Sequence, residues 1–251
     1  MKISVEKNGN KYEADLSKPI DLSIVLQNGL DNPNCFWAPP VDYSPVVAGD
    51  FVGSTARGGP VNFFNVKFNP HGNGTHTECV GHIARERYVL HECLLQQHFW
   101  AKLVSLYPRP ADGDRVFFRD QFEEVLGKNE VEALLLRSLP NDTLKKTRNY
   151  SGTNPPYLHH EAARYLVECG VQHLLIDLPS VDREEDGGRL LAHHAFWQYP
   201  DAVRKYCTIT EMIFVPDSVK DGIYLLNLQT ASFDLDVSPS KPLLFAVNPW
   251  L

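Results

Sequence analysis

A helix that runs directly into a buried strand, within residues 162–182, constrains the fold more than any other feature. Four residues recur there at helical spacing: Ala162, Tyr165, Leu166 and Cys169. Gly170 suits the position after the last helical turn. The apolar run over residues 171–178 then predicts a buried strand, which a polar loop follows. Such a unit is typical of α/β proteins, in which ligands gather beyond the carboxyl end of the strand.

Other segments of the chain carry strand signals. The start predicts a hairpin, because residues 3–5 and 11–16 alternate in polarity around a strong Asn8-Gly9 turn signal. A short helix is expected over residues 118–126. Further strands are expected at residues 61–68, 101–106, 131–136, 209–215, 223–228 and 243–247.

The composition excludes several classes of function. The chain has 251 residues, of which 43% are hydrophobic and 22% charged, as in a soluble protein with one sizeable core. A net charge of -7 disfavours a nucleic-acid partner, and no apolar run is long enough for a membrane span or a signal peptide. The five cysteines are irregularly spaced, which indicates reduced thiols. We therefore expect a cytoplasmic protein that is free of membranes.

Residues 28–60 lack clear periodicity and are rich in Asn, Pro and Gly. A loop of this length is more often functional than passive. Two interpretations stay open for its aromatic residues. Phe36 and Trp37 could form a lid that stacks on a flat substrate, or they could be ordinary surface packing. Further along, the basic run at residues 145–148 is expected to be a solvated loop.

A short glycine-rich segment holds three histidines and a carboxylate, namely His71, His76, Glu78 and His82. Imidazole and carboxylate are the usual ligands of a catalytic divalent metal. On a strand His76 and Glu78 would project from the same face, because they lie two residues apart. The neighbouring Cys79 could be a nucleophile, but a strand would point it away from both. The segment predicts a metal or acid–base site.

A second part of the site is expected later in the chain. Glu211 lies in an otherwise apolar, strand-like run. Such a carboxylate lies either on an exposed edge or beside a cation, and we favour the cation. The loop after Asp182 leads to His193 and His194, either of which could be a ligand.

These segments together resemble a known family. Residues 74–82 read Gly-Thr-His-Thr-Glu-Cys-Val-Gly-His, and residues 177–182 read Asp-Leu-Pro-Ser-Val-Asp. With residues 19–23, His193 and Glu211, they are similar to the cyclase-like metal-dependent hydrolases, which include bacterial kynurenine formamidase and isatin hydrolase. That family carries the motif H-x-G-T-H-x-D-x-P-x-H. The resemblance runs over most of the chain.

The resemblance implies a fold and a site. The fold would be a single α/β domain of the swivelling β/β/α type over residues 1–251, with a mixed sheet and flanking helices. His76 and Glu78 would bind metal, and Glu78 could bridge two ions. His193 and Glu211 would complete the shell of the second ion, and His82 would be the general acid–base residue. Family members use zinc or manganese and often form homodimers or homotetramers.

The chain departs from the family pattern at its first ligand. Gly72 stands where the family has a histidine, and His71 lies one residue earlier. A local bulge could restore His71 as a ligand; otherwise the site holds one metal ion or none. Glu78 also replaces the family's aspartate, which changes the coordination geometry. One or two metal ions per chain are therefore expected.

The leading hypothesis is a metal-dependent, arylformamidase-like hydrolase of a small-molecule amide, cyclic amide or ester. His82 would take a proton from water and return it to the leaving group. Two rivals remain. One is a non-catalytic small-molecule-binding protein on the same fold with a degraded metal site. The other is a metal-dependent lyase or isomerase that uses the same residues.

Overall fold

The centre of the molecule is a mixed sheet whose middle strands are parallel. In the computed structural model, which describes residues 1–250, apolar runs of the sequence form parallel neighbours: β9 (His98–Leu106), β12 (Ala133–Ser138), β14 (His173–Ile176) and β15 (Thr208–Glu211). The last three are buried along their whole length, as strands covered on both faces must be. These strands were predicted. β15 ends before the predicted residue 215, because Met212 adopts a φ of 52°.

Antiparallel strands close this sheet on itself. β16 (Gly222–Thr230) pairs with β9, and β17 (Val237–Pro249) pairs with β16. β17 also pairs with β8 (His76–Glu78), which in turn pairs with β15. The result is a closed, barrel-like sheet. Within this sheet the pairing of β8 with β15 sets His76 opposite Glu211, so two distant parts of the sequence meet.

The predicted N-terminal hairpin is confirmed. It consists of β1 (Lys2–Lys7) and β2 (Asn10–Asp15). Asn8 and Gly9 take φ values of 52° and 76°, which suits a two-residue hairpin turn. The hairpin extends the sheet along the end of β17, and β3 (Ile20–Asp21) pairs with the middle of that strand.

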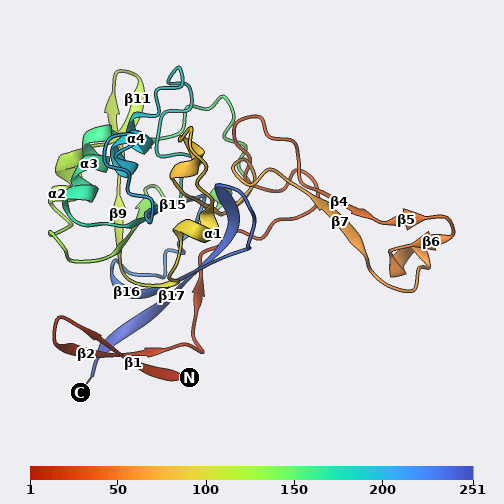
Figure 1. Cartoon of the computed structure of the whole chain (residues 1–251), viewed down its shortest axis with the longest axis horizontal. Coiled ribbons are helices and arrows are strands. Elements are labelled where there is room, and N and C mark those ends of the chain that lie inside the picture. The colour runs from red at the N-terminus through yellow and green to blue at the C-terminus, as the bar shows by residue number, and fades with distance from the viewer. Residues whose placement is uncertain (251) are drawn as a thin grey trace.

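Helices cover one face of the sheet (Figure 1). The predicted helix before β14 is α3 (His160–Glu168), and it packs against α2 (Arg119–Glu123) and α4 (Leu191–Trp197). These helices form one apolar core with that face of the parallel strands. A second core lies on the opposite face, where α1 (Leu90–Cys93) contributes. The predicted α/β fold with a mixed sheet and flanking helices is confirmed, although α2 is shorter than expected.

An arm projects from this body (Figure 1). Its elements are β4 (Asp42–Pro45), β5 (Val47–Ala48), β6 (Phe51–Val52), η1 (Thr55–Arg57) and β7 (Phe64–Lys67). β4 pairs with β7, and β5 pairs with β6. The expectation of an irregular loop was therefore wrong for the second half of residues 28–60. The strand predicted at residues 61–68 is shorter and exposed, because it pairs with β4 and stays outside the main sheet.

Smaller elements complete the described structure: β10 (Arg109–Ala111), β11 (Asp114–Phe117), β13 (Tyr157–Leu158), η2 (Val80–His82) and η3 (Thr143–Lys146). The expectation of a solvated loop at residues 145–148 was wrong at its first residue. Lys145 is buried, and its Nζ lies 2.7 Å from Asp177 Oδ2. None of the helices in residues 1–250 has both the length and the apolar character needed to cross a membrane.

Candidate metal centre

Strand β8 presents His76 and Glu78 to one cluster, as their spacing predicts. His76 Nδ1 lies 3.0 Å from the carbonyl oxygen of Gly74, and Glu78 is buried beside three imidazoles. Cys79, the next residue, packs instead into the second apolar core. A hydrogen bond to Cys93 and burial raise the pKa of the Cys79 thiol far above its usual range, which disfavours a nucleophilic role.

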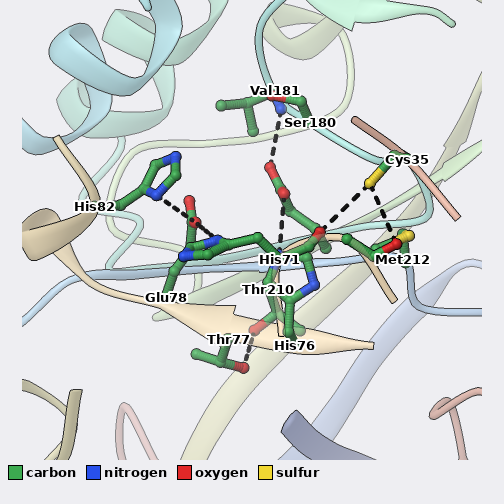
Figure 2. A network of polar contacts seen from close by, with 12 residues as sticks. Cys35, His71, His76, Thr77, Glu78, His82, Ser180, Val181, Thr210 and Met212 are labelled. Carbon is green, nitrogen blue, oxygen red and sulfur yellow. Dashed lines mark hydrogen bonds and ion pairs between the residues drawn. The ribbon is translucent and has the colours of Figure 1, made fainter. Parts of the chain in front are cut away.

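His71 reaches the same cluster although it is displaced by one residue. Its Nδ1 lies 3.1 Å from Glu78 Oε2 (Figure 2). The backbone at Gly72 explains the displacement. A Cβ at that position would lie 2.2 Å from the Cβ of Ala38, so no histidine fits there. The turn is held by Asn69, whose Oδ1 accepts from Gly72 N at 3.0 Å.

Glu211 brings a second carboxylate from the end of β15. Its Oε2 lies 3.3 Å from His76 Nε2, and its Oε1 accepts from Val181 N at 3.0 Å. The side chain is buried, so the exposed-edge interpretation of this acid was wrong. The pairing of β15 with β8 places the two side chains together.

The start of α4 positions His193. Its Nε2 lies 3.1 Å from Glu78 Oε1, and its Nδ1 lies 2.6 Å from Asp182 Oδ2. Asp182 also accepts from the backbone N–H groups of Ala192 and His193, which fixes the imidazole against the helix. His194 points elsewhere and contacts the carbonyl of Tyr199. The geometry therefore selects His193 as the residue that can join the cluster.

The solvent side of the cluster is formed by His71, His82 and Asp236, each between a quarter and a third exposed. Asp236 Oδ2 lies 3.0 Å from His71 Nε2 and 3.7 Å from His82 Nδ1. His82 Nδ1 also lies 3.6 Å from Glu78 Oε2. Buried donors thus form the floor of the site, and His82 stands at its opening.

Neighbouring charges govern protonation in this cluster. Burial lowers the pKa of His71, but hydrogen bonds to Asp236 and Glu78 outweigh burial and raise it to about 10. Burial is likewise outweighed at His193, where Asp182 and Glu78 raise the pKa to about 10. Burial disfavours the Glu78 carboxylate, yet the nearby imidazoles hold its pKa well below the usual range. The cluster of carboxylates therefore favours bound positive charge.

The donors fit a divalent cation. His76 donates from Nδ1 to a carbonyl oxygen, so in the neutral imidazole Nε2 carries the lone pair. Within residues 1–250 this buried Nε2 makes no hydrogen bond, although Glu211 Oε2 lies 3.3 Å away. His193 likewise donates from Nδ1 to Asp182 and directs Nε2 at a carboxylate, an arrangement typical of metal-ligating histidines. Three overlapping groups have donor atoms within 4.8 Å: His71/His82/Asp236, His71/His76/Glu78 and Glu78/His82/His193.

Two features of the site differ from the site expected from the sequence. Asp236 was missed, because it joins the cluster only through the pairing of Val237 with Glu78 across β17 and β8, which no local pattern indicates. The aromatic pair at residues 36–37 lies outside the cluster. Trp37 lines a neighbouring cavity, whereas Phe36 is exposed and is absent from the residues that line it.

The chain matches a known protein family. Residues 15–183 match the Cyclase family model, described as "Putative cyclase". The chain belongs to this family. The match includes β8, His82 and Asp182, whereas α4, Glu211 and Asp236 lie beyond its end.

Curated relatives and solved structures agree with the cyclase family. A kynurenine formamidase of Bacillus cereus is 30% identical over 127 residues, which cover 48% of this chain and 56% of that protein. The chain thus spans about half the length of that relative. Another, from Bacillus thuringiensis, is 26% identical over 234 residues, or 91% and 97% of the two chains.

Two solved structures share the fold. A potential metal-dependent hydrolase with cyclase activity has a TM-score of 0.66 at 16% identity, with 92% of this chain and 99% of that chain covered. An isatin hydrolase bound to thioisatinate has a TM-score of 0.63 at 15% identity, with 93% of each chain covered. At such identities the likeness establishes the fold.

Proposed function

We propose that this chain is a metal-dependent hydrolase of an amide, cyclic amide or ester, and that it cleaves a carbon–nitrogen bond outside peptides. The observation that carries the proposal is the convergence of His71, His76, Glu78, His193 and Glu211 on one buried cluster with His82 at its solvent side. The cyclase-family match and the names of the curated relatives support the same class of reaction.

Nitrogen and carboxylate donors without thiolates suit zinc or manganese. His76 and Glu211 would hold one ion and His193 a second, with Glu78 between them and His71 on the solvent side. One or two ions per chain are compatible with these overlapping groups. When bound, the metal supplies Lewis acidity, which acidifies water and polarises a carbonyl group.

His82 would carry the proton during hydrolysis. Its imidazole is partly open to solvent, and its Nδ1 faces the carboxylates of Glu78 and Asp236. These carboxylates stabilise the imidazolium that forms when Nε2 takes a proton from the attacking water. The same proton then passes to the departing amine nitrogen as the carbon–nitrogen bond breaks. Asp236 is a positioning residue in this scheme, because it orients the imidazole without touching the substrate.

The test compares two variants with formanilide as the substrate. His82→Ala should keep its metal and lose at least about 100-fold in kcat, the lower range for a general acid–base group. His76→Ala should lose both metal and turnover. His91→Ala, an exposed histidine outside the cluster, is the matched control. Full turnover in His82→Ala, or unchanged metal content in His76→Ala by elemental mass spectrometry, would contradict the proposal.

A further inference from the structure

A cavity of about 520 Å³ lies beyond the carboxyl ends of three parallel strands. Pro108 lies just after β9, Leu139 after β12 and Leu178 after β14, and all three residues line the cavity. The three strands are neighbours in the sheet. Ligands of α/β proteins gather at this end of parallel strands. Among residues 1–250, none of those that line the cavity belongs to the metal cluster, so the two sites are separate.

Part of the cavity wall is apolar and stiff. Tyr150 and Leu178 contribute side chains, and four prolines extend the apolar lining: Pro108, Pro140, Pro155 and Pro156. A proline has a fixed φ and no side-chain freedom to lose, so such a wall has its shape before a ligand arrives. The volume and the apolar wall suit a small organic molecule, because an inorganic ion alone would leave that wall without a partner.

Arg115 supplies a guanidinium group to the cavity. It lies in β11, and its side chain is exposed where it lines the cavity. It makes no ion pair within residues 1–250, whereas its charged neighbours do: Arg109 contacts Asp120, and Asp114 contacts Arg183. The N–H donors of Arg115 are therefore available to an anion.

Arg148 brings a second guanidinium group to the same cavity. Its Nη2 lies 2.9 Å from Asp142 Oδ2, and its guanidinium carbon lies 5.7 Å from the centre of the Tyr150 ring. These contacts orient the group but use only part of its five donors. Asp142 is the one acidic residue among the described residues that line the cavity, and its Oδ1 also accepts from Leu144 N at the start of η3. The two arginines thus share a single carboxylate.

Lys145 also lines the cavity but has no donor to spare. Its Nζ lies 2.6 Å from Ser138 O, 2.7 Å from Asp177 Oδ2 and 3.2 Å from Asn141 Oδ1. These oxygens use its three donors, and the Asp177 carboxylate offsets its charge. The two arginines and the one lining carboxylate therefore leave an excess of one positive charge, which attracts a monoanion.

We propose that this cavity is a second ligand site, which binds a carboxylate anion with a small apolar body. Arg115 and Arg148 hold the carboxylate, because a planar guanidinium group matches both of its oxygens. The prolines and Tyr150 contact the apolar body. The site is separate from the metal centre, so this inference does not depend on the proposed hydrolysis.

Benzoate is the probe, and calorimetric titration of the metal-loaded protein measures its affinity. Arg115→Gln and Arg148→Gln should each weaken binding about 10-fold or more, because each removes a charge-assisted contact. Arg109→Gln, at an exposed arginine of the neighbouring strand β10 outside the cavity, should leave the affinity unchanged. Benzamide, which has the same ring but no charge, should bind at least about 10-fold more weakly than benzoate.

A carboxylate is also a metal ligand, so two further measurements locate the site. His76→Ala should keep the wild-type affinity for benzoate, although it loses metal. In the metal-loaded wild type, benzoate should protect Arg115 and Arg148, but not Arg109, from modification by phenylglyoxal, as mapped by peptide mass spectrometry. Equal affinity in the wild type and both arginine variants, or no protection of Arg115 and Arg148, would overturn the proposal. Equally tight binding of benzamide or of inorganic phosphate would overturn the assignment to an organic acid.

Discussion

At the scale of single residues, the replacement of a family histidine by Gly72 does not remove a donor from the cluster. The backbone at Gly72 lies so close to Ala38 that no side chain fits at this position. The turn instead places the side chain of the preceding residue, His71, beside Glu78. His71 therefore still reaches the cluster, and its role as a metal ligand stays a prediction.

We expect His71→Ala to lower the affinity for zinc or manganese. The loss should exceed the roughly 10- to 100-fold that removal of an outer-shell partner costs, because a direct donor disappears. Titration of the metal-free protein with Zn²⁺ by calorimetry measures this, and His194→Ala is a control from the edge of the site. Equal metal affinities in the wild type and in His71→Ala would show that His71 is not a metal ligand.

At the scale of elements, β14 contains a buried titratable group far from the cluster. His173 packs against Phe99, and its Nδ1 lies 2.8 Å from Thr208 Oγ1. Burial lowers its pKa to about 3. The folded protein therefore keeps this imidazole neutral, whereas the unfolded chain protonates it near its ordinary pKa of about 6.5.

This difference makes stability depend on pH in one direction. The contribution of His173 is complete above pH 6.5 and is lost as the pH falls from about 6.5 towards 3, at about 1.4 kcal/mol per unit. His173→Gln should be less stable at pH 8 but should lose less of its stability between pH 7 and 5. Denaturant unfolding at several pH values checks this, with His91→Gln as the exposed control. Identical pH slopes for the three proteins would contradict the prediction.

Some of these elements could be predicted from the sequence, and others could not. The strands with continuous apolar runs and the helix α3 were predictable, because burial on both faces or on one stripe leaves a periodic signal. The direction of His76 and Glu78 followed from the period of a strand. Asp236 and the orientation of His193 by Asp182 were out of reach, since each depends on which distant strands pair or where a loop returns.

At the scale of the whole molecule, the arm exposes an unusual amount of apolar surface. Five apolar residues of the arm, which stands away from the body (Figure 1), are each between 43% and 61% exposed: Val47, Val61, Phe63, Phe64 and Val66. A two-stranded ribbon is marginally stable alone, and exposed apolar surface of this extent is typical of association sites. We therefore expect the arm to pack against a second copy of the chain, in a homodimer or a homotetramer.

Light scattering coupled to size-exclusion chromatography tests this expectation at micromolar concentration. The wild type should elute with a mass of two or four chains, and Phe63→Asp combined with Val66→Lys should shift it towards the 28.4 kDa of one chain. The charges would have to be buried without partners in the assembly, whereas in the monomer they stay in water. Leu144→Asp, at an exposed site outside the arm, should leave the mass unchanged. A wild-type monomer at 100-fold higher concentration would mean that the arm is stable without a partner.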